Sequence, residues 1–198
     1  ELTGARAVSS WPAIKLTDRG AIKRVRTAQV DLSGIAKGYA IDRAVEAMRS
    51  AGVARGVVDV GGDVRGFGGE TEPISVGLRN PFGDGAWGAV RIADAAVCTS
   101  GNYARYVEIG GQRYSHIVDP RTGLPADLTP SVTVIAPDAM TADAWATALS
   151  VLGRDGLARL PDDVHAMIVS GGRDDYAVHT TEGFGQWMAE SASGRFAE

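Results

Sequence analysis

The sequence predicts an α+β fold, in which mixed and mainly antiparallel sheets pack against a few helices. Two long segments, at about 35–50 and 139–152, have the apolar spacing of helices. Many shorter segments have strand-like composition, and glycine-rich turns separate them as in hairpins. Long runs of strands with few helices between them are typical of α+β domains with a largely antiparallel sheet.

The first part of the chain is predicted to form a hairpin, a helix and a strand. A turn signal at 18–20 separates strand-like segments at 13–16 and 21–25. The first helix is expected from about 35 to 50, and it stops before a glycine. A strand over 55–60 follows, and it ends in a glycine-rich turn.

The rest of the chain predicts mostly strands around a second helix. This helix runs over 139–152, between an N-cap at Asp138 and a stop at Gly153, and a short helix is expected over 155–160. Two consecutive glycines at 110–111 indicate a hairpin. The expected strands lie at 74–78, 89–92, 96–99, 105–109, 113–117, 131–136, 164–170 and 176–180.

Length and composition exclude several classes of protein. The 198 residues suffice for one domain with a substantial core, and we expect residues 1–198 to form a single domain. The net charge of -4 does not favour binding to nucleic acid or to an anionic membrane. A single cysteine, Cys98, excludes an intrachain disulfide and a cysteine-based zinc site. No apolar run approaches the roughly 18 residues of a membrane span, and we find no signal peptide.

Lys37 is the first candidate functional residue. The first helix is expected to bury Ile41, Ala44, Val45 and Met48 and to expose Asp42, Arg43, Glu46 and Arg49. Lys37 falls in line with the buried face, in the first turn, where free N–H groups and the positive end of the helix dipole gather. Ser33 and Gly34 would let a ligand approach, so this arrangement predicts a phosphate site. The alternative is a lysine that extends into water.

Two glycine-containing turns are weaker candidates. Gly61, Gly62 and Asp63 follow a strand, but the absence of a Gly-x-Gly-x-x-Gly motif and of a following helix excludes a dinucleotide fingerprint. We interpret them as a turn that lines a pocket, with Asp63 as a polar contact, or else as a plain β-turn. The segment 99–103 similarly offers small donors and an aromatic face at a strand end.

Asp143 and Thr147 predict a metal site. They stand one helical turn apart, beside an expected inner stripe of Met140, Ala144, Ala148 and Val151. An unpaired buried carboxylate is costly, and Mg²⁺ or Ca²⁺ would accept both oxygens as ligands. The alternative is that Asp143 is solvated or paired with an arginine.

His116 and Asp119 stand on either side of a predicted turn. Pro120 and Gly123 supply that turn. His116 could serve as an acid, a base or a phosphate contact, although a lone histidine is more often structural. His165 and His179 have no comparable neighbours and are interpreted as structural or surface residues.

Taken together and in this order, these segments resemble the ApbE family, the FAD:protein FMN transferases. The first match is Asp-Leu-Ser-Gly-Ile-Ala-Lys-Gly at 31–38, within a longer match at 31–42. The others lie at 60–63, 100–103, 116–123 and 136–149. Each motif is modest alone, but the ordered set is specific and spans roughly residues 15–172.

The resemblance implies a T-fold-like architecture, FAD as substrate and Mg²⁺ as cofactor. It implies metal ligation by Asp143, by Thr147 and by a backbone carbonyl assigned to Ala36. FMN would pass from FAD to a threonine hydroxyl of a target protein, and AMP would leave. His116 and Asp143 are the expected catalytic residues, with Asp143 first of all a ligand. The residues expected to bind the flavin nucleotide are Ser33, Gly34, Lys37, Gly61, Gly62, Asp63, Ser100, Gly101, Tyr103, His116 and Asp119.

The chain departs from the family pattern in two ways. Ser33 stands where the family usually has glycine, which is still compatible with a tight turn. Family members also carry a substantial N-terminal segment that contributes to the FAD pocket, and we expect this chain to lack it. By family analogy, the target is a flavin-carrying subunit of a membrane redox complex, and the location is periplasmic or otherwise extracytoplasmic.

Two other functions use the same residues. With water as acceptor, the site would act as a Mg²⁺-dependent FAD pyrophosphatase that yields FMN and AMP. A non-catalytic FAD-binding protein is the third hypothesis, although it has less need of the Asp143 and Thr147 pair.

Overall fold

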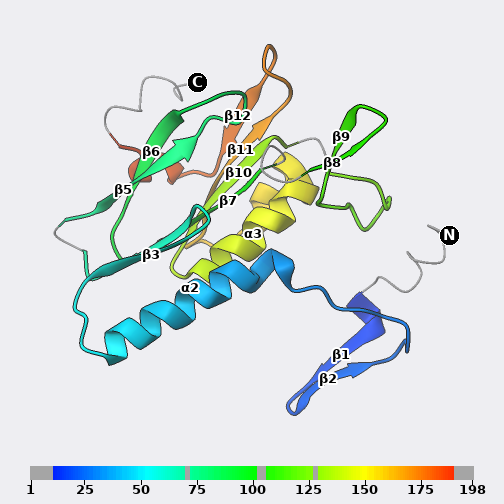
Figure 1. The fold of residues 1–198 in the computed structure, drawn as a ribbon, viewed down its shortest axis with the longest axis horizontal. Coiled ribbons are helices and arrows are strands. Elements are labelled where there is room, and N and C mark those ends of the chain that lie inside the picture. Colours follow the sequence, from blue (N-terminus) through cyan, green and yellow to red (C-terminus); the bar gives the residue numbers. More distant parts are fainter. Residues whose placement is uncertain (1–10, 70–71, 102–105, 127–128, 190–198) are drawn as a thin grey trace.

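A six-stranded sheet forms the centre of the computed structural model, which describes residues 11–69, 72–101, 106–126 and 129–189 (Figure 1). The strand order is β12-β11-β10-β7-β4-β3, and each pair of neighbours is antiparallel. The strands are β3 (Gly56–Val60), β4 (Asp63–Phe67), β7 (Ala96–Gly101), β10 (Ser131–Ala136), β11 (His165–Ser170) and β12 (Ala177–Thr180). The predicted α+β class with mainly antiparallel pairing is confirmed.

Two helices cover one face of this sheet. They are α2 (Ser33–Ser50) and α3 (Ala139–Leu152), close to the predicted bounds, and 3-10 segments occur at η1 (Trp11–Ala13), η2 (Gly153–Arg159) and η3 (Phe184–Trp187). The η2 segment stands where a short helix was expected. The core between helices and sheet includes Ile41, Cys98, Val132, Val134 and Leu149. No helix in the described part of the chain has the length and apolar character needed to cross a membrane.

A hairpin of β5 (Ile74–Arg79) and β6 (Ala86–Ile92) packs on the opposite face of the sheet. A second core, built around Val90, Ile135 and Phe184, fills the space between this hairpin and the sheet. Strand β10 is buried at every position because it has a core on each side. The molecule is therefore layered, with helices, sheet and hairpin in succession.

Strand β4 was not predicted. Gly61 and Gly62 form the turn between β3 and β4, and both have positive φ, a conformation that glycine adopts without strain. Within β4, a Cβ on Gly66 would lie 2.7 Å from the carbonyl oxygen of Ala93. Glycine lowers strand propensity, but Gly66 is needed here because the backbone of Ala93 passes close by.

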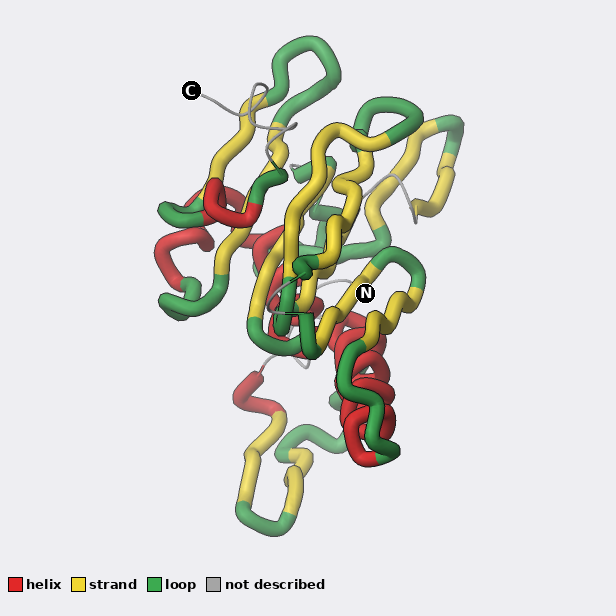
Figure 2. Tube along the Cα trace, turned by 90° about the vertical axis from the view of Figure 1, so that its left-hand side faces the viewer, coloured by secondary structure: helices red, strands yellow, loops and turns green. Residues whose placement is uncertain are grey.

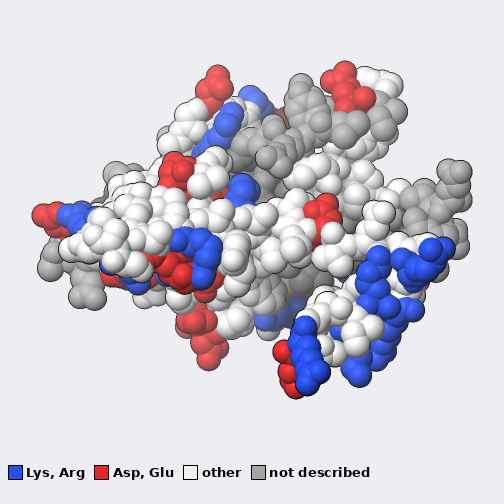
Figure 3. All heavy atoms as spheres, turned by 60° about the horizontal axis from the view of Figure 1, so that its bottom comes forward, with Lys and Arg blue, Asp and Glu red and all other residues white. Residues whose placement is uncertain are grey.

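Two further hairpins lie outside the central sheet. They are β1 (Ile14–Thr17) with β2 (Gly20–Lys23), and β8 (Tyr106–Ile109) with β9 (Gln112–Ser115). The β1–β2 hairpin projects away from the body in both views (Figures 1 and 2). Figure 3 shows lysine and arginine gathered on it, and the exposed cations of this region are Lys15, Arg19, Lys23, Arg24 and Arg26. The net charge of -4 conceals this local concentration.

Helices α2 and α3 touch backbone to backbone at Gly38. A Cβ added to Gly38 would lie 2.2 Å from the carbonyl oxygen of Ala139 and 2.6 Å from the Cα of Met140. Only glycine fits this contact without moving a helix. The position also brings the first turn of α2 alongside the middle of α3, where Gly34 meets Thr147.

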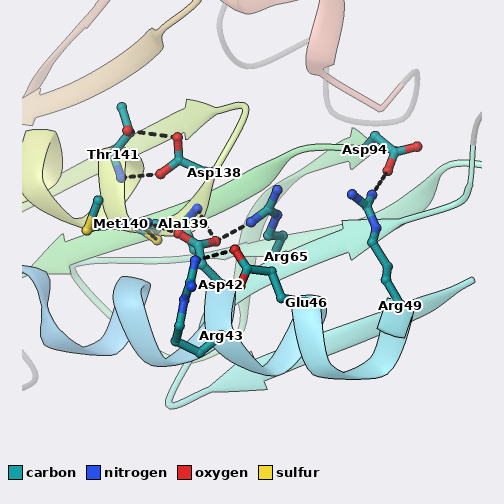
Figure 4. Close-up of polar contacts among 11 residues, drawn as sticks. Asp42, Arg43, Glu46, Arg49, Arg65, Asp94, Asp138, Ala139, Met140 and Thr141 are labelled. Carbon is teal, nitrogen blue, oxygen red and sulfur yellow. Dashed lines mark hydrogen bonds and ion pairs between the residues drawn. The ribbon is translucent and has the colours of Figure 1, made fainter. Parts of the chain in front are cut away.

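A buried carboxylate joins the same two helices (Figure 4). Asp42, which is 6% exposed, accepts hydrogen bonds from the N–H groups of Ala139 and Met140, each at 2.9 Å. Arg65 of β4 pairs with it. An anion at a helix N-terminus satisfies otherwise unpaired N–H groups and complements the helix dipole. We predicted Asp42 on the exposed face of α2, which is wrong, because α3 and β4 cover it.

The expected inner stripe of α3 is also wrong. The buried residues of α3 are Ala139, Ala142, Asp143, Ala146, Leu149 and Ser150, whereas Met140 is 40% exposed. Alanines occur on several faces of this helix, so apolar spacing could not identify the buried one. Asp138 caps α3 as predicted, accepting from Thr141 N at 2.8 Å.

Replacing Gly38 with alanine tests the helix contact. We expect Gly38→Ala to lower the free energy of unfolding by about 1–3 kcal/mol, because its methyl group overlaps the backbone of Ala139. Urea denaturation measures the change. The control is Gly185→Ala, where a Cβ would meet no atom within 4 Å and the change should stay within about 0.5 kcal/mol. Equal effects at the two positions would contradict the close contact.

Replacing Asp42 with alanine tests the buried carboxylate. We expect Asp42→Ala to cost about 3–5 kcal/mol of unfolding free energy, because it leaves the charge of Arg65 buried and unpaired. Thermal and urea unfolding should both report this loss. Glu46→Ala removes an exposed carboxylate from the same helix and should change stability by less than about 1 kcal/mol. A loss for Asp42→Ala no larger than that of Glu46→Ala would refute the structural role.

Candidate active site

A cavity of about 750 Å³ lies where the start of α2, the middle of α3 and the ends of several strands meet. The β3–β4 turn and the last residues of β7 form part of its wall, and the segment 116–118 forms another part. Among its lining residues are ten that the sequence predicted: Ser33, Gly34, Lys37, Gly61, Gly62, Ser100, Gly101, His116, Asp143 and Thr147. Residues from five separate motifs therefore line one cavity.

Asp143 and Thr147 face α2 from α3. Asp143, 4% exposed, accepts a hydrogen bond from the N–H of Gly38 at 3.0 Å. The Thr147 hydroxyl donates to the carbonyl oxygen of Gly34 at 3.3 Å. A Cβ on Gly34 would lie 3.1 Å from the Thr147 methyl carbon, so the absence of a side chain allows this approach.

These contacts bring three kinds of oxygen together at the cavity. They are a carboxylate from Asp143, a hydroxyl from Thr147 and a backbone carbonyl from Gly34. The resemblance assigned the carbonyl to Ala36, but Ala36 is not among the residues that line the cavity. The carbonyl that the structure places beside Thr147 is that of Gly34.

The oxygen donors suit a hard cation. Magnesium and calcium prefer oxygen ligands, and none of these groups is a soft ligand. In the described ranges, no group of three or more His, Cys, Asp and Glu residues could hold a metal ion. A cation here would therefore rely on one carboxylate and two neutral oxygens, with ligand phosphates or water in the remaining positions.

Burial raises the pKa of the Asp143 carboxyl. The hydrogen bond from Gly38 and the charge of Lys37 oppose this rise, whereas the charge of Asp63 adds to it. Desolvation disfavours the ionised form of a carboxyl group, and a nearby cation would restore it. Asp143 thus stands in an environment that favours either a proton or a metal ion on the carboxylate.

Lys37 reaches the cavity from the second turn of α2, and its side chain is 37% exposed. Its ammonium group pairs with Asp63. Asp63 is 1% exposed and also accepts from the Thr99 N–H at 3.0 Å. Asp63 was predicted to contact the ligand, but it is not among the residues that line the cavity. It instead forms an ion pair with Lys37, which does line the cavity.

The start of α2 offers fewer N–H groups than the sequence suggested. Ser33 N donates to Asp31 at 2.8 Å, and Ile35 N donates to the carbonyl of Leu32 at 3.0 Å. The hydrogen bonds from Ser33 lower the pKa of the Asp31 carboxyl. These two N–H groups are therefore not open to a phosphate, whereas the Lys37 cation lines the cavity.

Of His116 and Asp119, the structure places only His116 among the residues that line the cavity. His116 lines the cavity, whereas Asp119 lies in the following turn, accepts from Arg121 N at 2.8 Å and pairs with the Arg121 side chain. Asp119 therefore serves the turn rather than the cavity wall. Tyr103, also predicted to contact the nucleotide, lies outside the described residues.

Several lining residues were not predicted. Gly77 and Arg79 come from β5 on the far side of the sheet, and no motif around them points to a site. Asp31 and Thr99 belong to the segments 31–42 and 99–103 that the sequence points to, but neither is among the predicted ligand contacts. Apolar side chains of Ile117, Val118 and Val151 add a hydrophobic part to the wall.

Comparison with known proteins gives a consistent result. A family model described as the ApbE family matches residues 1–168. A FAD:protein FMN transferase of Klebsiella pneumoniae is 39% identical over 166 residues, which is 81% of this chain and 45% of that protein. A protein of the same name from Rhodobacter capsulatus is 36% identical over 91% of this chain and 32% of its own length. The chain thus spans less than half of these two relatives.

Solved structures show the same similarity. The ApbE protein of Thermotoga maritima superimposes with a TM-score of 0.86 at 35% identity, covering 96% of this chain and 63% of that one. The flavin transferase ApbE of Vibrio cholerae gives a TM-score of 0.81 at 28% identity, covering 94% of this chain and 61% of that one.

Cation binding at Asp143 is expected to weaken as the pH falls. The folded pKa lies above the ordinary carboxyl value of 3.8, so protonation should displace the cation at a higher pH than at an exposed aspartate. Titration of Mn²⁺ by calorimetry at several pH values between about 4 and 7 measures this. Asp143→Asn, which carries no titrating carboxyl, should bind Mn²⁺ weakly at every pH.

The same shift affects the metal-free protein with the opposite sign. A folded pKa above the unfolded one means that the folded state binds the proton first, so stability falls as the pH rises through the interval between them. Metal-free Asp143→Asn should therefore lose less stability than the wild type between acidic and neutral pH. Parallel unfolding curves for the two proteins would contradict the assignment.

Proposed function

The chain belongs to the ApbE family, and we propose that it carries the active site of an FAD:protein FMN transferase. In this proposal FMN moves from FAD to a threonine hydroxyl of a target flavoprotein, and AMP leaves. One observation above all supports the proposal, namely the cavity in which the oxygens of Asp143, Thr147 and Gly34 lie near Lys37. A carboxylate-bound cation and a lysine are what the cleavage of a pyrophosphate requires.

The proposed reaction exchanges one phosphorus–oxygen bond for another. The threonine oxygen forms a bond to the phosphorus of the FMN half, and the bond from that phosphorus to the oxygen of the AMP phosphate breaks. The hydroxyl proton passes to a base, and the bonding electrons leave with AMP. Negative charge develops on the phosphate oxygens, so the site must supply positive charge where they lie.

Mg²⁺ is the proposed cofactor, held by Asp143, Thr147 and the carbonyl of Gly34. The fit rests on the donor set, because these groups are oxygens and the carboxylate is buried where a cation would stabilise its charge. When bound, the ion would neutralise phosphate charge and orient the two phosphates. The carbonyl of Gly34 replaces that of Ala36 in this proposal because it is the one that Thr147 touches.

Lys37 supplies a second positive charge to the cavity. Asp63 anchors its ammonium group, and the lysine side chain is partly exposed and lines the cavity. An ammonium group has three donors, so an ion pair with Asp63 leaves donors for a phosphate oxygen. The buried carboxylate behind it keeps the lysine oriented before the substrate arrives.

His116 is proposed to receive the proton of the acceptor hydroxyl. It lines the cavity, whereas Asp143 is committed to the cation and is then a poor base. Imidazole can accept and return a proton near neutral pH. The apolar wall of Ile117, Val118 and Val151 offers a surface for the flavin ring.

The target is proposed to be a flavin-carrying subunit of a membrane redox complex that faces the periplasm or another extracytoplasmic space. This proposal follows from family resemblance.

Incubation with FAD, Mg²⁺ and a threonine-bearing acceptor protein tests the proposed function. We expect AMP to appear in solution and flavin to stay on the acceptor after denaturation, both dependent on Mg²⁺. Asp143→Ala should reduce AMP release by about 100-fold or more, because metal assistance is worth several kcal/mol. Glu46→Gln removes an exposed carboxylate of α2 and serves as the matched control with unchanged activity.

The products distinguish the competing functions. AMP with free FMN and an unlabelled acceptor would indicate a pyrophosphatase. Bound FAD that survives Mg²⁺ unchanged, with no effect of Asp143→Ala, would reject both enzymatic functions and indicate a binding protein.

A further inference from the structure

Lys37 pairs with one buried carboxylate and lines the same cavity as a second one. It pairs with Asp63, which is 1% exposed, and its charge also acts on Asp143, which is 4% exposed. Asp143 contacts the N–H of Gly38, the residue next to Lys37. One flexible ammonium group thus has two carboxylates near it, although only one of them is its partner.

Asp63 is held by more than the lysine. One carboxylate oxygen accepts from Thr99 N at 3.0 Å, and the other accepts from Lys37. It begins strand β4, and Thr99 belongs to β7, so the carboxylate is fixed between two adjacent strands of the central sheet. A carboxylate held this rigidly can direct a long side chain with little loss of its own freedom.

An ion pair between Lys37 and Asp143 would obstruct a cation. The ammonium group would occupy the oxygens of the carboxylate that the proposed metal site shares with Thr147 and Gly34. It would also neutralise the one formal negative charge of that site. Close charge pairs interact strongly, so this competition would lower the affinity of the site for a metal ion.

We propose that Asp63 is a positioning residue that draws the Lys37 ammonium group away from Asp143 and so keeps the Asp143 carboxylate open to a divalent cation. The inference rests on the proposed function for the identity of the metal ligands. It assigns Asp63 a role that depends on charge, because an uncharged replacement would keep the hydrogen bond from Thr99 and lose the hold on Lys37.

Asp63→Asn is the direct test, with Tb³⁺ luminescence as the readout. Tb³⁺ is a hard cation that prefers oxygen ligands, and Trp145 on α3 can sensitise it. We expect Asp63→Asn to weaken Tb³⁺ binding by about ten-fold or more, because the freed lysine moves to Asp143. The part of the Tb³⁺ luminescence that Asp143→Asn abolishes belongs to this site. Glu46→Gln controls for the loss of one carboxylate elsewhere.

Removing the lysine should reverse the effect. The double variant Asp63→Asn with Lys37→Gln lacks the competing ammonium group and should bind Tb³⁺ within about three-fold of the wild type. Lys37→Gln alone should bind Tb³⁺ as tightly as the wild type or more tightly, since Asp63 then adds uncompensated negative charge. If Asp63 only stabilised the fold, a second substitution at Lys37 would not restore Tb³⁺ affinity.

Several results would overturn the inference. They are unchanged Tb³⁺ affinity in a folded Asp63→Asn variant, a failure of the double variant to recover, and weaker binding by Lys37→Gln. If Asp63→Asn does not fold, the result for Lys37→Gln decides. If Asp143→Asn leaves Tb³⁺ binding unchanged, the proposed metal site is wrong, and this inference fails with it. The expected Tb³⁺ series without FMN transfer would support the inference and reject the proposed activity.

Discussion

The contact between the middle of α2 and the first turn of α3 is the constraint on which the site depends. Gly38 lets the two backbones touch, and Asp42 binds the first N–H groups of α3 while it pairs with Arg65 of β4. One buried carboxylate thereby joins two helices and the sheet. Because α2 and α3 lie far apart in sequence, this joint fixes which residues of one helix face the other, and the site is built directly beside it.

The same closeness that stabilises the helix pair creates the chemistry. Asp143 is one turn beyond the joint on α3, and it meets the backbone of α2 at Gly38. Thr147 lies a turn further and reaches the carbonyl of Gly34. Burial disfavours the charge of Asp143, so the fold holds a carboxylate that a cation would stabilise. Stability and function therefore rest on adjacent turns of one helix pair.

The local elements were largely accessible from the sequence. The bounds of α3, its cap at Asp138 and the β8–β9 hairpin follow from residues near one another in the chain. Apolar periodicity did not predict which helix residues are buried where more than one element packs against the helix. Asp42 was placed on the solvent face of α2, and the alanines of α3 gave no unique buried stripe. The sequence does not predict strand β4, because Gly66 lowers its strand propensity. The reason for this glycine is the close approach of the Ala93 backbone, which exists only in the tertiary structure.

The sequence by itself determined the family pattern, the helix that carries Asp143 and Thr147, and the lysine at the start of α2, because motif spacing and helical geometry are local properties. Only the tertiary structure decided how these residues are used. It paired Lys37 with Asp63, added Arg79 from the hairpin across the sheet and placed the carbonyl of Gly34 beside Thr147. Each of these outcomes depends on a contact between distant segments, and no local spacing encodes such a contact.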